Sequence, residues 1–245
     1  MTTTTRAVPT GSVGSTRDPR TTWRLLAAVL LPIGPLGVAI LRGLMPYWTS
    51  DGSEDMVAGI AAHPDRTETM LWVFFLAYPP LVLAPLVIGF VTRYAAPRLS
   101  TWGAGLTFLG FVGLGAVGST DLQVHAMTQD GFNQSSIVQA YDAVAGHPVA
   151  SVSVGLFVIG HIVGMILLGI AVAKSGLVPA WVGVAIAVSQ PVHFVSAVVI
   201  PSRWLDVTLG WGLTTIGFAF VAAAIWRMSN DSWDRRPQTQ DIGPA

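Results

Sequence analysis

The stretch VASVSVGLFVIGHIVGMILLGIAVA, residues 149–173, carries no acidic or basic residue, and its one ionisable side chain is His161. A helix rises 1.5 Å per residue, so about 20 apolar residues cross the ~30 Å hydrocarbon core of a bilayer. The stretch is long enough to do so and predicts a membrane-spanning helix.

Five further apolar runs of this kind flank it, at residues 23–46, 68–92, 102–121, 178–200 and 204–227. The composition agrees, because 52% of the residues are hydrophobic, only 11% are charged and the mean hydropathy is +0.60. Soluble domains carry roughly 25% charged residues. The sequence therefore predicts an all-α polytopic membrane bundle with six transmembrane helices in residues 23–228.

The two ends of the chain differ in composition from this domain. Residues 1–22 are rich in Thr, Ser, Gly and Pro, and residues 229–245 are similarly polar, so both segments are predicted to be disordered. Arg17, Arg20 and Arg24 precede the first apolar run as they would in a signal peptide. That run continues without a small-residue cleavage site before Pro46, which indicates a retained helix.

The basic residues predict the orientation. With the N-terminus inside, ten of the thirteen Lys and Arg residues fall in cytoplasmic segments, and only Arg42, Arg66 and Arg203 fall outside. Cytoplasmic segments are the ones enriched in Lys and Arg. We therefore expect a multi-pass protein of the plasma membrane with both termini in the cytoplasm.

Weak internal similarity suggests a further grouping of the helices. Trp23, Trp102 and Trp181 are spaced 79 residues apart, each at the start of an odd-numbered span. The segments VAGIAAHP (57–64) and DAVAGHP (142–148) each end an outer loop, and a short amphipathic stretch belongs to each loop. The six helices would then be three repeated hairpins, formed by spans 1–2, 3–4 and 5–6.

Proline and small residues are frequent inside the spans. Span 2 contains AYPPLVLAP (77–85), and because each proline removes a backbone donor, span 2 is predicted to be the broken or strongly kinked helix. Span 4 carries two pairs of small residues four apart, Gly160 with Gly164 and Ser151 with Gly155. Such pairs allow close helix packing in a bilayer.

A polar stripe interrupts span 5 in VSQPVHFVSA (188–197). At 100° per residue, Ser189, Gln190, His193 and Ser196 fall within about 120° of the helix circumference. They must therefore face protein or water. Two interpretations remain: hydrogen bonds between helices, which average ~0.6 kcal/mol in membranes, or the wall of a binding site.

His161 lies near the middle of span 4 beside Gly160 and Gly164, so we expect its ring to point into the bundle. Intramembrane ionisable residues are functional candidates. Counted from the helix ends, His161 and His193 differ in depth by ~7 Å at 1.5 Å per residue, which argues against a haem held between them. No cofactor, metal site or catalytic residue is predicted.

Several acidic residues gather at the outer rim. Asp206 and Glu68 each open a helix, where the helix dipole favours a carboxylate. Asp121, at the outer end of span 3, is instead assigned to the candidate binding site.

The chain resembles the uncharacterised six-span integral membrane proteins of high-GC bacteria. The resemblance covers most of residues 21–228 and is carried by RLLAAVLLPIGPLGVAILRG, by the AAHP and AGHP loops and by VPAWVGVAIAVSQPVHFVSAVVIPSR. It implies the six-span architecture and transfers no functional residue.

The favoured function is the binding or transport of a small or lipophilic ligand through an outward-facing polar pocket. The residues assigned to that pocket are His193, Gln190, His161, Asp121, Ser189 and Ser196. Two alternatives remain, a membrane enzyme or haem redox protein using His161 and His193, and a structural subunit that binds a partner.

The chain has no cysteine and a formal net charge of zero, which exclude thiolate chemistry and argue against a nucleic-acid partner. The expected partners are the lipid bilayer and the ligand, with a second copy of the chain or another membrane protein left open.

Overall fold

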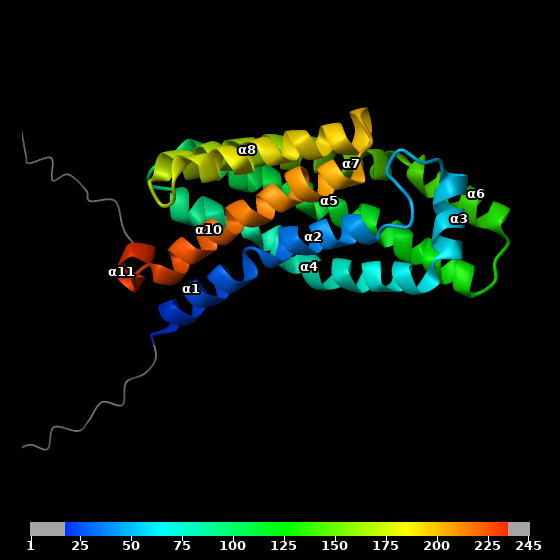
Figure 1. The fold of residues 1–245 in the computed structure, drawn as a ribbon, viewed down its shortest axis with the longest axis horizontal. Helices are drawn as coiled ribbons and strands as arrows, with labels where there is room; N and C mark the ends of the chain where they lie inside the picture. The colour runs from blue at the N-terminus through cyan, green and yellow to red at the C-terminus, as the bar shows by residue number, and fades with distance from the viewer. Residues whose placement is uncertain (1–17, 235–245) are drawn as a thin grey trace, which may run out of the picture.

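The computed structural model describes residues 18–234, and every regular element within them is a helix (Figure 1). Six segments are long and apolar enough to cross a membrane, which confirms the all-α six-span bundle. They are span 1 (α1, Pro19–Leu30, and α2, Ile33–Leu44), span 2 (α4, Pro64–Thr92), span 3 (α5, Pro97–Gln129), span 4 (α7, Pro148–Ser175), span 5 (α8, Ala180–Phe194, and the π-helix η1, Val195–Val199) and span 6 (α9, Arg203–Leu205, the π-helix η2, Asp206–Gly212, and α10, Leu213–Arg227).

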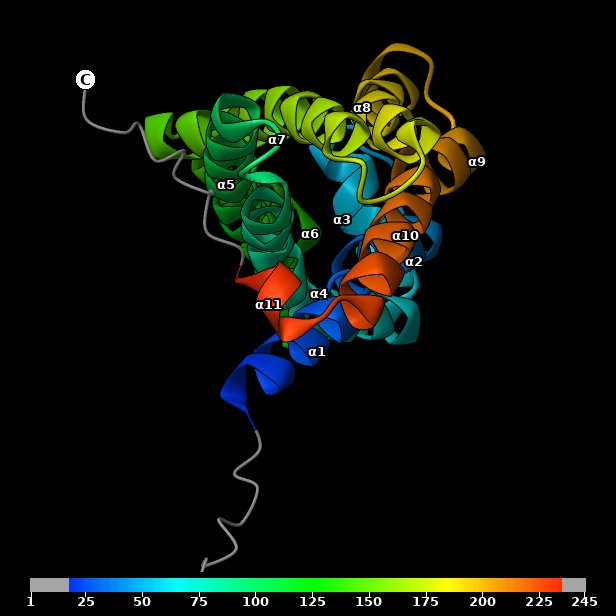
Figure 2. The same ribbon diagram turned by 90° about the vertical axis from the view of Figure 1, so that its left-hand side faces the viewer.

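The spans form a ring in chain order. Each span packs against the one before it and the one after it, and span 6 returns to pack against span 1. Figure 2 looks into the ring from the end at which the described chain begins and ends. Short connections at 93–96, 176–179 and 200–202 place consecutive helices side by side and antiparallel, and longer segments join span 1 to span 2 and span 3 to span 4.

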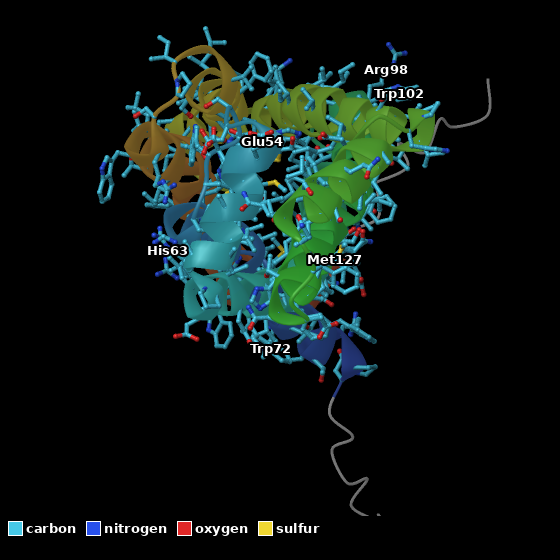
Figure 3. All side chains as sticks on the ribbon, turned by 90° about the vertical axis from the view of Figure 1, so that its right-hand side faces the viewer. Glu54, His63, Trp72, Arg98, Trp102 and Met127 are labelled. Atoms are coloured by element: carbon cyan, nitrogen blue, oxygen red, sulfur yellow. The ribbon has the colours of Figure 1, made fainter. Side chains whose placement is uncertain are left out.

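Two short helices, α3 (Ser53–Ala62) and α6 (Gln134–Ala145), lie across the opposite end of the bundle. Both come from the amphipathic stretches that the sequence predicted, and they bury Val57, Ile60 and Ile137 against Val124 of α5. Figure 3 faces this end, where Glu54 and His63 mark the two ends of α3 and Met127 lies on the neighbouring helix. We call this the outer end and the opposite one the terminal end.

Tryptophans mark both edges of the apolar surface. Trp102 and Trp181 are exposed at the terminal end, and Trp72 and Trp204 are exposed at the outer end. Trp72 and Trp102 lie at the periphery of the bundle in Figure 3. Tryptophan rings are enriched at the two membrane interfaces, so these positions fit a bilayer around the ring.

Span 2 is not broken, because α4 continues through Pro79, Pro80 and Pro85, and the alternative of a strong kink stays a prediction. The chain breaks instead in span 1, where α1 ends at Leu30 and α2 begins at Ile33. A neighbouring helix supports α4 at its prolines. A Cβ on Gly34 of α2 would lie 2.5 Å from the Leu81 backbone, so the two helices are in direct contact there.

The polar ends of the chain are more ordered than predicted. Residues 19–22 belong to α1, and residues 230–233 form the short helix α11 (Asn230–Trp233), so the expectation of disorder is wrong for both. Residues 1–17 and 235–245 lie outside the described residues.

Hydrogen bonds between α1, α10 and α11 account for this order. Arg24 is buried and donates through Nη1 to the carbonyls of Ile225 and Trp226 at 3.0 and 2.8 Å. Its Nε donates to Oδ1 of Asn230 at 3.2 Å, and Nδ2 of Asn230 donates to Asp18 at 3.1 Å. Arg24 therefore donates to carbonyls in the last turn of α10, one of which, that of Ile225, also accepts from the backbone N–H of Met228.

Asp18 completes this contact as the N-cap of α1. Its carboxylate accepts hydrogen bonds from the side chain and the backbone N–H of Arg20, and these hold the pKa of Asp18 at about 2. The carboxylate is therefore charged at neutral pH, where it favours the helix N-terminus.

The terminal half of the ring has a solid apolar core. Buried side chains from all six spans meet there: Leu31, Ile88, Ala104, Met165, Leu168, Val172, Val182, Ile186, Phe218, Val221 and Ile225. Glycines bring the helices into close contact around this core. A Cβ on Gly169 of α7 would lie 2.5 Å from the carbonyl oxygen of Gly183 on α8.

The pair Gly160 and Gly164 packs α7 directly against α5, whereas a Cβ on Gly155 would meet no atom within 4 Å. A Cβ on Gly164 would meet the Thr107 backbone nitrogen at 2.5 Å and the Gly103 oxygen at 2.9 Å. We expect Gly164→Ala to lower the free energy of unfolding by about 1–3 kcal/mol through overpacking, measured by thermal unfolding in detergent.

Gly155→Ala on the same helix is the matched control. Nothing lies within 4 Å of its added Cβ, so this variant should be at least as stable as the parent. Equal stability of the two variants would contradict the close packing of α5 on α7.

Candidate functional site

A cavity of about 310 Å³ occupies the outer half of the ring. Helices α2, α4, α5, α7 and α8 and the π-helices η1 and η2 contribute to its wall. The apolar part of the wall is made by Val38, Leu41, Met45, Met70, Leu71, Phe74, Leu114, Val154, Phe157, Val158, Ile162, Phe194, Ala197, Val198 and Trp211. The pocket is mostly apolar, where the sequence had suggested a polar one.

The cavity reaches the surface between α7 and η1. Val154 of α7, together with Phe194 and Val198 at the end of span 5, lines the cavity and is also exposed. Val198 is 59% exposed. These three side chains lie within spans, on the side that lipid would occupy, whereas Thr49, which also lines the cavity and is exposed, lies in the loop between α2 and α3.

Aromatic and imidazole rings form the floor of the cavity. The His161 ring stacks on Phe157 with centroids 4.3 Å apart and lies 5.7 Å from the ring of His193. Trp211 lies 5.2 Å from His193, and Phe111 lies 6.3 Å from Trp211. This layer separates the cavity from the solid core of the terminal half.

A buried chain of charged and polar groups closes one side of the floor. Arg42 of α2 donates through Nε to Oδ2 of Asp206, whose side chain is completely buried. The other carboxylate oxygen, Oδ1, lies 2.5 Å from Nδ1 of His193 and 3.4 Å from the hydroxyl of Ser196. Asp206 thus joins span 6 to spans 1 and 5 at once.

The π-helix η2 makes this arrangement possible. Asp206 and Trp211 are five residues apart, which at 3.6 residues per turn would place them about 140° apart. The i→i+5 pattern of a π-helix widens the turn, so residues five apart lie on one face. Both side chains consequently reach His193, and the indole nitrogen of Trp211 lies 3.2 Å from Nδ1.

The hydrogen bond of His161 to the backbone defines the tautomer of its ring. Nδ1 of His161 bonds to the Phe157 carbonyl oxygen, which can only accept, so Nδ1 carries the hydrogen. In its neutral ring the lone pair is then on Nε2. Nδ1 of His193 lies between Oδ1 of Asp206 and the indole N–H of Trp211, which donates to it at 3.2 Å. Nε2 of His161 is buried and has no partner among the described residues.

A second polar pair lies on the cavity wall. The hydroxyl of Tyr47 donates to Oδ1 of Asp121 at 2.6 Å. Burial, together with the nearby Asp121 carboxylate, raises the pKa of Tyr47 well above its usual range, so the hydroxyl stays protonated. Asp121 is therefore held by a neutral donor.

The six sequence-predicted site residues separate into two groups. His161, His193 and Asp121 line the cavity, and Ser196 lies behind it on the carboxylate of Asp206. Gln190 and Ser189 lie outside the wall, where Gln190 donates to Thr214 at 2.7 Å and Thr214 donates to Ser189 at 2.8 Å. These two side chains hydrogen-bond span 5 to span 6.

The structure corrects two expectations at the site. The rings of His161 and His193 contact each other, although their predicted depths differed by ~7 Å, because depth counted from helix ends ignores the π-helix and the unequal lengths of the spans. Asp206 was assigned to the dipole of its helix, but it is the buried partner of Arg42 and His193.

Sequence reasoning did not assign Arg42, Asp206, Tyr47 or Trp211 to the site. One signal could have found the first two, because an arginine and an aspartate at similar depth in apolar segments are expected to pair. A π-helix has no comparable signature, so the position of Trp211 was not predictable in this way.

The cavity holds no cluster of metal ligands. No group of three or more His, Asp and Glu side chains that could hold a metal ion occurs within residues 18–234. Nε2 of His125 and Oε2 of Glu68, neither of which lines the cavity, lie 4.0 Å apart.

No protein-family model, curated protein or solved structure matches the chain. The fold and the cavity define the class of protein: a polytopic integral membrane protein with an apolar cavity on one side of its helix ring.

Asp206→Ala should lower the free energy of unfolding by about 3–5 kcal/mol, because it leaves the buried guanidinium of Arg42 without its counter-charge. Thermal unfolding in detergent measures the loss. The double variant Arg42→Met with Asp206→Leu removes both charges and should regain most of it. A double variant as unstable as Asp206→Ala would show that the loss does not come from an unpaired charge.

Proposed function

We propose that the protein binds a small lipophilic molecule in the cavity. The observation that carries this proposal is an apolar cavity lined by His161, whose Nε2 is buried and has no hydrogen-bond partner among the described residues. A buried polar atom without a hydrogen bond costs free energy, and a bound ligand can remove that cost.

Size and chemistry support a ligand of this kind. Pockets for small molecules have volumes of roughly 300–1,000 Å³ and mostly apolar walls with a few placed polar groups. The cavity of about 310 Å³ matches the lower end, and its polar groups gather at the floor and at Tyr47 and Asp121. A charged, water-soluble molecule would find few partners on such a wall.

The mouth between α7 and η1 supports entry from the membrane. We place the mouth in the outer leaflet of the plasma membrane, because the terminal end carries most of the basic residues. Those described are Arg20, Arg24, Arg93, Arg98, Lys174 and Arg227. The basic residues of the outer end are all engaged within the fold, Arg66 and Arg203 at the last carbonyls of α2 and Arg42 at Asp206.

The solid core favours binding over passage through the ring. Below Phe111 and Trp211 the helices are in close contact, and fully buried side chains fill the space between them. A ligand that enters from the mouth would stop at the histidines.

Filling the cavity should abolish binding. In nanodiscs, a lipophilic dye such as N-phenyl-1-naphthylamine should bind the parent protein saturably, above the signal of empty nanodiscs. Val158→Trp places a bulky ring inside the cavity and should weaken this binding by at least tenfold. Val163→Trp, an exposed position on the same helix, is the control and should bind as the parent does. Unchanged binding in folded Val158→Trp would refute the proposal.

Single cysteines test the orientation, because the chain has none of its own. Cysteines replacing the exposed Asp55 and Asp142 should react with a membrane-impermeant thiol reagent in intact cells. Cysteines replacing the exposed Ala95 and Ala180 should react only after lysis. The reverse labelling pattern would place the cavity in the inner leaflet.

A further inference from the structure

Resting on the proposed function, we infer that the ligand is a lipophilic alcohol whose uncharged hydroxyl donates a hydrogen bond to Nε2 of His161. The volume and the apolar wall of the cavity do not specify a polar group on the ligand, whereas the unpartnered Nε2 does.

The need for a donor follows from the hydrogen bond on the far side of the ring. Nδ1 of His161 donates its hydrogen to the Phe157 carbonyl, so Nε2 of the neutral ring is an acceptor. His161 is only 1% exposed, and no described residue donates to its Nε2. An ether or a ketone can only accept and would leave this nitrogen unsatisfied, whereas a hydroxyl can donate to it.

The charges around the cavity argue against an anionic ligand. The positive charge of Arg42 is already paired with Asp206. The other carboxyl group on the cavity wall, that of Asp121, can contribute only negative charge, which would repel an anion. A fatty acid or a phosphate would bring a further negative charge into a region of low dielectric constant without an unpaired cation to meet it.

A hydroxyl can also accept a hydrogen bond from an unsatisfied donor near the cavity. Nη2 of Arg42 is buried without a hydrogen-bond partner among the described residues, and Arg42 lines the cavity with His161. A hydroxyl oxygen accepts as well as donates, so this group is compatible with both kinds of unsatisfied atom.

The test uses four molecules with the same twelve-carbon tail: dodecanol, dodecyl methyl ether, dodecanoate and dodecylamine. Each displaces N-phenyl-1-naphthylamine from the protein in nanodiscs, with concentrations expressed per lipid to remove differences in partitioning. Dodecanol should displace the dye at about a tenfold lower concentration than the ether, because only the alcohol satisfies Nε2.

Two variants of His161 assign the preference to one atom. In His161→Asn the amide nitrogen can still donate to the Phe157 carbonyl, but no atom replaces Nε2, so alcohol and ether should become equivalent. In His161→Gln the side-chain oxygen can take the acceptor position, so part of the preference for alcohol should return. An unchanged affinity for the ether shows that each variant keeps its cavity.

The outcomes separate this inference from the proposed function. If the ether binds the parent as well as the alcohol does, or if the preference survives in His161→Asn, the hydroxyl assignment is wrong while the cavity remains a binding site. Tighter binding of dodecanoate or dodecylamine overturns it as well. If none of the four molecules displaces the dye, or if Val158→Trp binds them equally well, the proposed function itself fails.

Discussion

The buried ion pair between Arg42 and Asp206 determines how the ring of helices closes. Span 1 and span 6 are the most distant spans in the chain, and a bilayer provides no hydrophobic force that draws one helix to another. At the terminal end, Arg24 joins the same two spans through the last carbonyls of α10. In the outer half an isolated Arg42 or Asp206 would be costly in apolar surroundings, and pairing removes most of that cost. Two arginines of span 1, one near each end, therefore hold the ring shut.

The same closure explains why one half of the ring is solid and the other hollow. In the terminal half, glycines such as Gly169 and Gly183 let the helices approach until their side chains fill the centre. In the outer half, space is taken by the Asp206 network on one side, and the widened turns of η1 and η2 change the path of spans 5 and 6. The side chains there form a wall around the cavity, and the ring of Trp211 lies between the cavity and the solid core of the terminal half.

The architecture could be predicted from the sequence, but the partners of individual polar residues could not. Long apolar runs specify spans because a bilayer admits only backbones that satisfy their own hydrogen bonds. Proline is a weaker guide: α4 keeps its helix through three prolines because a neighbour supports it, and span 1 breaks instead. A helical wheel correctly placed Gln190 and His193 toward protein, yet one bonds Thr214 and the other reaches the cavity. The partner of each side chain depends on which face the neighbouring helix turns toward it. The sequence of span 5 alone does not specify that face.

The floor of the cavity combines two properties that are difficult to obtain together inside a membrane. It is polar enough to recognise a hydrogen-bonding group, yet its charges are compensated, because Asp206 pairs with Arg42 and contacts His193. Nδ1 of His161 donates to the Phe157 carbonyl, which leaves Nε2 of its neutral ring as an acceptor. A charged floor would hold water and exclude an apolar molecule, and an entirely apolar floor would bind lipid tails without discrimination. A compensated network beside an unpartnered acceptor, Nε2 of His161, avoids both outcomes, so this site favours a molecule that can donate a hydrogen bond.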